Sequence, residues 1–481
     1  MTRSVLPLED RRRLWQHIAA TVAAHLIMMH EVQLIDDRTQ ATLLAALDAV
    51  RGADPPAEPL AALVAQFDDR LDALTPAGVA GTQRVGRGVA DVVAAIMRLD
   101  LRHQLLAFMT ELDRLRETAL VLAETHAVSL MPAFAGGQAT QPTTLGHFLG
   151  GLIAPLARAA TRLRAAFDEV NASPMGAGAL ASSGLGIDRE RLTALLGFDS
   201  LIGNTFDAVA ATDHLVSTAE AVAHVVTAGC RFIEEILAWL RMDPGSIRLA
   251  DRWTSASPDL PHWRAPVGLQ ALLAHGRTIE RDAATLRALA ASVGYGPIAG
   301  WADQLAGASL SLFRDAGRFA GDLIQLLSGM EINRAAFAHR AGRAYTTSSD
   351  LADILMLEEQ LDPGAARSIA ALAIARVMQE GVEISALTPE IIDAAALVVL
   401  GRELKIEFET ISRYLAPRRF IERRAATGAP SPASTRAWIA QERERLAADR
   451  RWREETASRL AAAVAHLEAA EREALDRAPS E

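Results

Sequence analysis

Cysteine and aromatic residues are scarce in this sequence of 481 residues. The single cysteine, Cys230, lies in an apolar helical run, so one chain can build neither a disulfide framework nor a cysteine metal site. We expect a buried, inert thiol there. Aromatic residues make up only 5% of the chain, alanine and leucine dominate, and the helix breakers gather in a few places. This composition is typical of long packed helices and predicts an all-α fold.

Long apolar runs and a basic surface are also missing. Residues 1–13 are charged and lack the apolar core of a signal peptide, and no window reaches the roughly 18 apolar residues of a membrane span. The net charge is −10, and charges of both signs are interspersed, which argues against a nucleic-acid partner. We therefore expect a soluble cytoplasmic protein with no membrane or nucleic-acid partner.

The sequence shows no pattern for a cofactor or metal. His25 and His30 are five residues apart, whereas a helical metal pair needs a spacing of four, so no metal is expected. The glycines between residues 176 and 186 do not follow a strand, which excludes a dinucleotide-binding loop. No cofactor is expected.

Helical periodicity is present over most of the chain. Long segments with one apolar side are expected at residues 8–32, 39–51, 86–127, 143–171, 205–241, 267–292 and 301–327. Glycine-rich connections are expected at residues 133–137 and 173–186, and a long proline-rich loop follows Met242. Asp362 before Pro363, and Thr388 before Pro389, predict two helix starts. We expect a linker at residues 427–434 and one charged amphipathic helix at residues 435–477.

The length exceeds what a single core supports, so several subdomains are expected. We predict an N-terminal helical domain at residues 1–95, a central long-helix bundle at 96–330 and a C-terminal helical domain at 331–481. A catalytic-type loop at 251–266 belongs to the central domain, and the terminal amphipathic helix to the third.

The middle of the sequence resembles a known family. The run Ser-Pro-Met-Gly-Ala-Gly-Ala-Leu-Ala at residues 173–181, with Ile-Asp-Arg-Glu at 187–190 and Leu-Leu-Gly-Phe-Asp at 195–199, is similar to the central region of argininosuccinate lyase and δ-crystallin. The likeness continues at Met131-Pro132, at Gln138, at Gln141-Pro142 and at residues 349–353. It covers about residues 15–440 and places the chain in the fumarase–aspartase superfamily.

This resemblance implies an architecture. Family members have three domains per chain and form a homotetramer with a twenty-helix core, in which each active site is assembled from three chains. The composition is compatible, because helices of forty residues with wide apolar faces need partners to bury them. We predict a homotetramer that acts on a small molecule.

The family's reaction eliminates an amine from a succinyl group through a carbanion, which needs a base, an acid and a preorganised anion site. Its mobile loop has the pattern Gly-Ser-Ser-x-Met-Pro-x-Lys-x-Asn-Pro, in which a serine is the base and the lysine and asparagine hold a carboxylate. Residues 256–266 match this loop. Ser257, Pro261 and Pro266 fit the pattern, whereas Trp263 replaces the lysine and Ala265 the asparagine.

Other family elements have lost their polar groups as well. The Thr-His pair falls on Ala135 and Gly136, and the carboxylate after the loop falls on Gln270. The Ser-Arg-Asn-Asp stretch becomes residues 88–91, with only Asp91 kept and Arg87 before it. The segment that recognises the amino-acid end becomes residues 298–301, which end in Trp301. Argininosuccinate cleavage should therefore be lost.

Two functional interpretations stay open. The first is an enzyme of specialised metabolism that catalyses a different elimination, dehydration or cyclisation on a less charged, more apolar substrate. Its candidate catalytic residues are Ser257, His262 and Arg264. Its candidate substrate-binding residues are Arg87, Asp91, Gln138, Asn204, Trp263 and Trp301, with Trp253 also near the predicted pocket. The second interpretation is an inactive pseudoenzyme that serves as a binding or structural protein.

Each candidate also has a purely structural interpretation. Ser257 fits a loop hydroxyl bonded to backbone, and His262 an exposed loop histidine. Arg87 and Asp91 are one helical turn apart and fit a surface ion pair. Asn204 fits a helix cap, and His147 fits a residue of the core or of a helix start.

Overall fold

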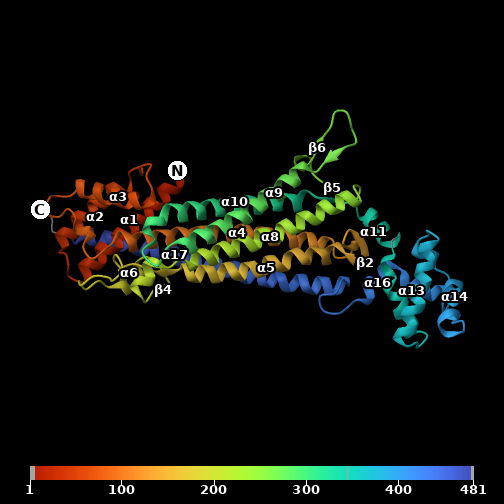
Figure 1. The fold of residues 1–481 in the computed structure, drawn as a ribbon. Helices are drawn as coiled ribbons and strands as arrows, with labels where there is room; N and C mark the ends of the chain where they lie inside the picture. The colour runs from red at the N-terminus through yellow and green to blue at the C-terminus, as the bar shows by residue number, and fades with distance from the viewer. Residues whose placement is uncertain (1–5, 344, 478–481) are drawn as a thin grey trace.

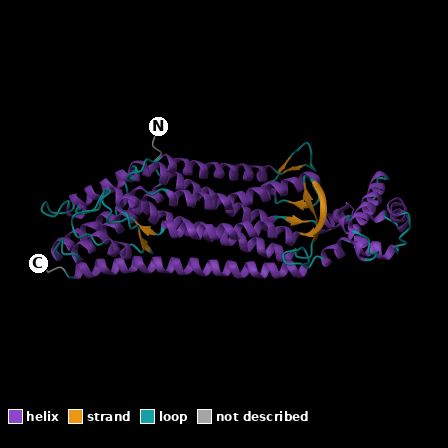
Figure 2. Ribbon diagram, turned by 60° about the horizontal axis from the view of Figure 1, so that its bottom comes forward, coloured by secondary structure: helices purple, strands orange, loops and turns teal. Residues whose placement is uncertain are grey.

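The computed structural model describes residues 6–343 and 345–477 and shows an elongated, mostly helical molecule (Figures 1 and 2). Five long helices lie side by side along its length. Their neighbours are α4 with α5 and α10, α8 with α5 and α9, and α9 with α10. The five are α4 (Val89–Thr125), α5 (Leu145–Val170), α8 (Asp213–Met242), α9 (Val267–Ser292) and α10 (Ala302–Gly329). The all-α prediction is confirmed.

One end of the bundle carries the N-terminal helices and several short elements. The element α1 packs against α2, α4 and α17, and α7 and η3 both pack against α4. A two-residue parallel pair, β3 with β4, lies at this end (Figure 1). The elements are α1 (Leu8–Glu31), α2 (Asp37–Arg51), α3 (Leu60–Ala73), η1 (Thr82–Arg84), β3 (Ala172–Ser173), α6 (Arg189–Leu195), β4 (Ser200–Leu201), α7 (Thr205–Ala210) and η3 (Ile298–Trp301).

The other end of the bundle carries three short antiparallel strand pairs. The strands β1 (Leu130–Ala135) and β2 (Gln138–Thr144) form a hairpin where a glycine-rich connection was expected. Gly136 and Gly137 make its turn with φ values of 57° and 77°, which glycine adopts readily. A second pair joins β5 (Ile247–Arg248) to β8 (Glu331–Ile332). After η2 (Asp251–Trp253), the hairpin of β6 (Ser255–Ala256) and β7 (Arg264–Ala265) projects from the bundle (Figure 1).

A separate group of short helices lies beyond this end, with an apolar core of its own between Leu351 and Leu415. The predicted helix starts at Pro363 and Pro389 are confirmed, and the Asp362 carboxylate accepts hydrogen bonds from the backbone of Gly364 and Ala365. The elements are α11 (Arg334–Arg343), η4 (Tyr345–Thr347), α12 (Ser349–Leu357), α13 (Pro363–Gln379), η5 (Ile384–Ala386), α14 (Pro389–Leu400), α15 (Phe408–Leu415) and α16 (Pro417–Arg423).

The terminal helix α17 (Pro432–Asp476) runs back along the bundle (Figure 2). Its buried residues Ile439, Leu446 and Leu467 belong to the main core, and Arg453 forms an ion pair with Asp113 of α4 at 3.0 Å. The charged amphipathic helix is thus present as predicted. By packing, α17 belongs with the bundle, although the predicted division at 331–481 groups it with the short helices.

The bundle buries most of its large apolar side chains within one chain. Cys230 is fully buried, as expected, and burial raises the pKa of its thiol to about 12. Among the described residues of the five long helices, the exposed large apolar side chains are only Val89, Val121 and Val267. The expectation of wide uncovered apolar faces is therefore wrong, because the five helices and α17 cover one another.

None of the helices in the described parts of the chain is both long and apolar enough to span a lipid bilayer.

The start of α4 packs closely against the glycine turn that carried the family likeness. A Cβ atom on Gly88 would lie 2.6 Å from the carbonyl carbon of Gly178. Gly178 itself has a φ of +61°, in the left-handed region that favours glycine. Two glycines therefore allow the backbones of α4 and of this turn to touch.

This contact gives a stability prediction. Gly88→Ala should destabilise the protein by about 1–3 kcal/mol, because the new methyl group meets backbone that cannot rotate away. Thermal denaturation followed by circular dichroism measures the effect. Gly151→Ala on α5 is the matched control, since no atom lies within 4 Å of its added Cβ and alanine favours the helix. Equal melting temperatures for Gly88→Ala and the wild type would contradict the prediction.

Candidate functional site

The predicted site residues fall into two groups at opposite ends of the bundle. Asn204 precedes α8 and Ser257 follows it, and a helix of 30 residues is about 45 Å long. In the same way, Arg87 precedes α4 and Gln138 follows it, while Arg264 precedes α9 and Trp301 follows it. We call Arg87, Asp91, Asn204 and Trp301 the first half-site. We call Gln138, Ser257, His262, Trp263 and Arg264 the second half-site.

Arg87 in the first half-site is buried and paired with the N-terminal helices. Its Nη2 donates to the carboxylate of Asp68 on α3, which also lies 3.8 Å from Arg84. The Nη1 of Arg87 is buried and has no hydrogen-bond partner among the described residues. One donor of this guanidinium is thus left unsatisfied.

Asp91 is fully buried in the first turn of α4. Its carboxylate accepts hydrogen bonds from the backbone N–H groups of Gly88 at 3.0 Å, Val92 at 2.9 Å and Gly178 at 2.9 Å. Burial raises the pKa of Asp91 to about 6, although these donors oppose the rise. The expectation of a surface ion pair with Arg87 is wrong, because both residues are buried and each has another partner.

Asn204 caps the short helix α7, as its structural interpretation proposed. Its Oδ1 accepts hydrogen bonds from the backbone N–H groups of Phe206 at 2.9 Å and Asp207 at 3.1 Å. The capping bond explains why an asparagine stands at this position.

Aromatic side chains are exposed beside this cap. The rings of Phe206 and Tyr295 stack with centroids 5.2 Å apart and an angle of 15° between planes. Tyr295 is 78% exposed, and Trp301 of the nearby η3 is 39% exposed. Phe206 and Tyr295 were missed from the sequence. The signal was available for Tyr295, because it is one of only three tyrosines and precedes residues 298–301 by three positions.

The second half-site is a projecting hairpin. Ser255 pairs with Ala265, and Ala256 pairs with Arg264. Ser257 is half-buried, and in the described chain no hydrogen bond joins it to His262, which is exposed. Trp263 is 44% exposed, while Arg264 donates from Nη1 to the carbonyls of Pro261 at 3.2 Å and Trp263 at 3.0 Å. Within one chain, the hairpin with these groups and the first half-site lie at opposite ends of the bundle.

Two further predicted residues lie outside this hairpin. Gln138 begins β2 opposite Ala135 and is exposed, so the positions matching the family's Thr-His pair form the tip of β1–β2 without an acid or base. Trp253 is buried in η2, with the guanidinium carbon of Arg252 4.7 Å from its ring centroid. Its expected place in a pocket is wrong, because it packs in the core beneath the loop.

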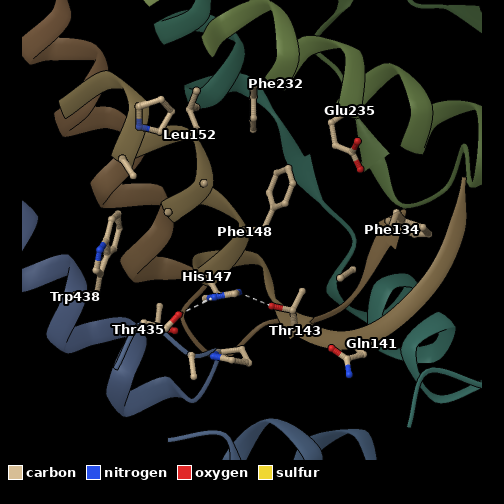
Figure 3. Close-up of a pocket in the computed structure, with 18 of the residues that line it drawn as sticks. Phe134, Gln141, Thr143, His147, Phe148, Leu152, Phe232, Glu235, Thr435 and Trp438 are labelled. Carbon is tan, nitrogen blue, oxygen red and sulfur yellow. Dashed lines mark hydrogen bonds between the residues drawn. The ribbon is translucent and has the colours of Figure 1, made fainter. Parts of the chain in front are cut away.

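His147 begins α5, as its structural interpretation proposed. Its backbone N–H donates to Thr144 Oγ1 at 3.1 Å, and its ring nitrogens contact Thr143 Oγ1 at 2.8 Å and the Gly428 carbonyl at 3.0 Å. His147 lines a cavity of about 880 Å³ (Figure 3). The residues that line this cavity belong to neither half-site. Over residues 6–343 and 345–477, no three His, Cys, Asp or Glu side chains are grouped to hold a metal ion.

Comparison with solved structures identifies the architecture. EDDS lyase in complex with formate has a TM-score of 0.83 to this chain at 24% identity, covering 98% of this chain and 93% of the other. The 3-carboxy-cis,cis-muconate lactonizing enzyme of Pseudomonas putida has a TM-score of 0.69 at 20% identity, with 92% and 96% covered. These likenesses show that this chain shares the fold of EDDS lyase and of the lactonizing enzyme.

Comparison of sequences identifies the family. The profile of a lyase family matches residues 73–280. The argininosuccinate lyase of Methanoculleus marisnigri is 31% identical over 92% of this chain and 90% of its own length. That of Methanosarcina acetivorans is 30% identical over 91% and 89%. The chain therefore belongs to the argininosuccinate lyase family of lyases.

Proposed function

We propose that this lyase no longer cleaves argininosuccinate and catalyses a different elimination, dehydration or cyclisation in specialised metabolism of the cytoplasm. Its substrate is small, less charged and more apolar than argininosuccinate. The observation that carries the proposal is the replacement of polar family positions by apolar or small residues at both half-sites. Trp263 stands where the family has its carboxylate-binding lysine, and Val89 and Trp301 are exposed at the first half-site.

The chemistry of these replacements supports the change of substrate. A dicarboxylate needs fixed cations and N–H donors around it, and neither tryptophan nor alanine supplies a charge. Exposed indole and phenyl faces instead favour planar or apolar groups. Arg264 is the cation left on the hairpin, and its guanidinium bonds only to backbone carbonyls among the described residues, so it can still meet a developing anion.

We also propose a homotetramer in which the two half-sites meet between chains. A separation of about 45 Å within one chain leaves each half-site incomplete. A copy that runs antiparallel brings its hairpin beside the first half-site of its neighbour, and two-fold symmetry makes the exchange mutual. The incomplete half-sites support this assembly. The surface of the long helices gives it no further support, because few large apolar side chains are exposed there.

Sedimentation velocity of the full-length protein at micromolar concentration tests the assembly. We expect a single species with the mass of four chains, about four times the 51.5 kDa of one chain. A stable monomer would contradict both the tetramer and the proposed composite site.

Argininosuccinate is the substrate to test first. Because the family's lysine, asparagine, histidine and Ser-Arg-Asn groups are replaced, we expect no detectable formation of fumarate. Loss of one such donor alone typically slows a reaction by about 100- to 1,000-fold. Fumarate absorbance measures the rate, with a relative's argininosuccinate lyase as positive control. A turnover of about 1 s⁻¹ or more, as in ordinary enzymes, would refute the proposal.

The hairpin is the proposed centre of the new reaction. A panel of 3-amino and 3-hydroxy acids with aromatic substituents, followed by absorbance of the new double bond, serves to find a substrate. On that substrate Ser257→Ala and His262→Ala should lower kcat at least about 100-fold, as expected for loss of a base or acid. Trp263→Ala should mainly raise KM. Ser255→Ala in the same hairpin is the control and should keep the wild-type rate.

The pseudoenzyme interpretation has one observation in its favour. Arg87 and Asp91 are held by contacts within the chain, so their retention is explained without catalysis. Wild-type kinetics in all three hairpin variants would remove the hairpin from the mechanism. A tetramer that turns over no member of the panel favours the pseudoenzyme.

A further inference from the structure

A cavity of about 880 Å³ lies at the end of the bundle (Figure 3), and the residues that line it belong to neither half-site. Four parts of the chain enclose it: the β1–β2 hairpin, the start of α5, the last turns of α8, and residues 424–438 with the start of α17. Cavities of this size accommodate drug-sized molecules. The question is which chemistry its walls would recognise.

Five aromatic side chains line the cavity. Phe148 lies 4.6 Å from Trp239 and 6.1 Å from Phe232 between ring centroids, and Phe134 lies 6.4 Å from Trp239. Trp438 of α17 stands on another side of the cavity, across α5 from Phe232 (Figure 3). It passes so close to Gly150 that a Cβ there would meet its ring at 3.1 Å. Such walls favour a planar or apolar body.

One carboxylate on this wall has no ion pair with any described residue. Glu235 is half-buried, and its Oε1 accepts a hydrogen bond from Trp239 Nε1 at 2.7 Å. The neighbouring Glu234 instead pairs with Arg277 at 2.6 Å. Of the two arginines that line the cavity, Arg424 is held by Asp350, and Arg231 is exposed at the rim. A carboxylate among aromatic faces is suited to an organic cation, which gains both ionic and cation–π attraction.

A buried hydroxyl in the same cavity lacks a partner. Thr435 is 3% exposed, and its Oγ1 makes no hydrogen bond within the described chain. Its neighbour His147 is already satisfied. Because the Gly428 carbonyl can only accept, the Nε2 of His147 donates to it, and Nδ1 accepts from Thr143. The unpaired hydroxyl of Thr435 is therefore left for a bound molecule.

We propose that this cavity is a second binding site, for a small organic cation with a protonated amine on an aromatic body. The amine pairs with Glu235, the ring lies against Phe148 and Trp239, and Thr435 bonds a polar atom of the ligand. The site joins the bundle to residues 424–431, which lead from the short C-terminal helices into α17. It is independent of the proposed reaction.

Isothermal titration calorimetry of the full-length protein with three indoles tests the proposal. The probes share one ring: tryptamine is a cation, indole-3-propionate an anion and 3-methylindole is neutral. We expect tryptamine to bind once per chain, with a dissociation constant below about 1 mM. The anion should bind at least tenfold more weakly than tryptamine. No saturable binding of tryptamine, or equal binding of the anion, would overturn the proposal.

Variants assign the binding to this cavity. Glu235→Gln keeps an acceptor for Trp239 and should weaken tryptamine at least about tenfold, with 3-methylindole unchanged. Glu220→Gln, also on α8 but outside the cavity, is the control and should bind like the wild type. Thr435→Val should weaken tryptamine several-fold. Unchanged affinity in both Glu235→Gln and Thr435→Val would place the binding elsewhere.

A cavity-filling variant covers the case in which Glu235→Gln fails to fold. Gly151 lines the cavity, and no atom lies within 4 Å of an added Cβ, so Gly151→Leu can fill the space without displacing its neighbours. We expect an unchanged melting temperature and loss of tryptamine binding. Full binding by a folded Gly151→Leu would also overturn the proposal.

Discussion

The rise of an α-helix, about 1.5 Å per residue, determines the rest of this structure. The helices α4, α8 and α9 each run the length of the bundle, so residues just before and just after each helix lie at opposite ends. Chemistry-bearing segments that are close in sequence, such as Asn204 and the hairpin at Ser257, therefore cannot meet within one chain. A functional site of this family has to form between chains, or the two half-sites have to work separately.

The way the bundle is packed limits how copies can associate. Large apolar side chains are buried inside the chain, and α17 adds a further helix held to α4 by ion pairs such as Arg116 with Asp449 at 2.6 Å. The exposed positions of α8, α9 and α10 are mainly arginine, alanine and glutamine. In the proposed tetramer, contacts between copies would therefore involve small and polar side chains more than large apolar ones.

The sequence predicts the helices far better than the site. Apolar periodicity places α9 and the start of α1 at the correct residue, because long helices carry many repeats of the signal. The hairpin β1–β2 is missed, since two glycines look like a flexible connection. The partners of Arg87 and Asp91 are also missed, because Asp68 and Gly178 are distant in sequence. The cavity draws on four separated segments, which no local pattern brings together.

The positions that match the family and those that differ have different physical roles. Asp91 accepts hydrogen bonds from three backbone N–H groups, so the fold itself requires this retained residue. Val89, Trp263 and Trp301 are exposed, so packing inside the chain does not explain why these replacements are apolar. The retained Asp91 is therefore explained by the scaffold, whereas in the proposed function the exposed replacements contact the substrate. The substrate should be inferred from the tryptophans and not from the surviving Arg87 and Asp91.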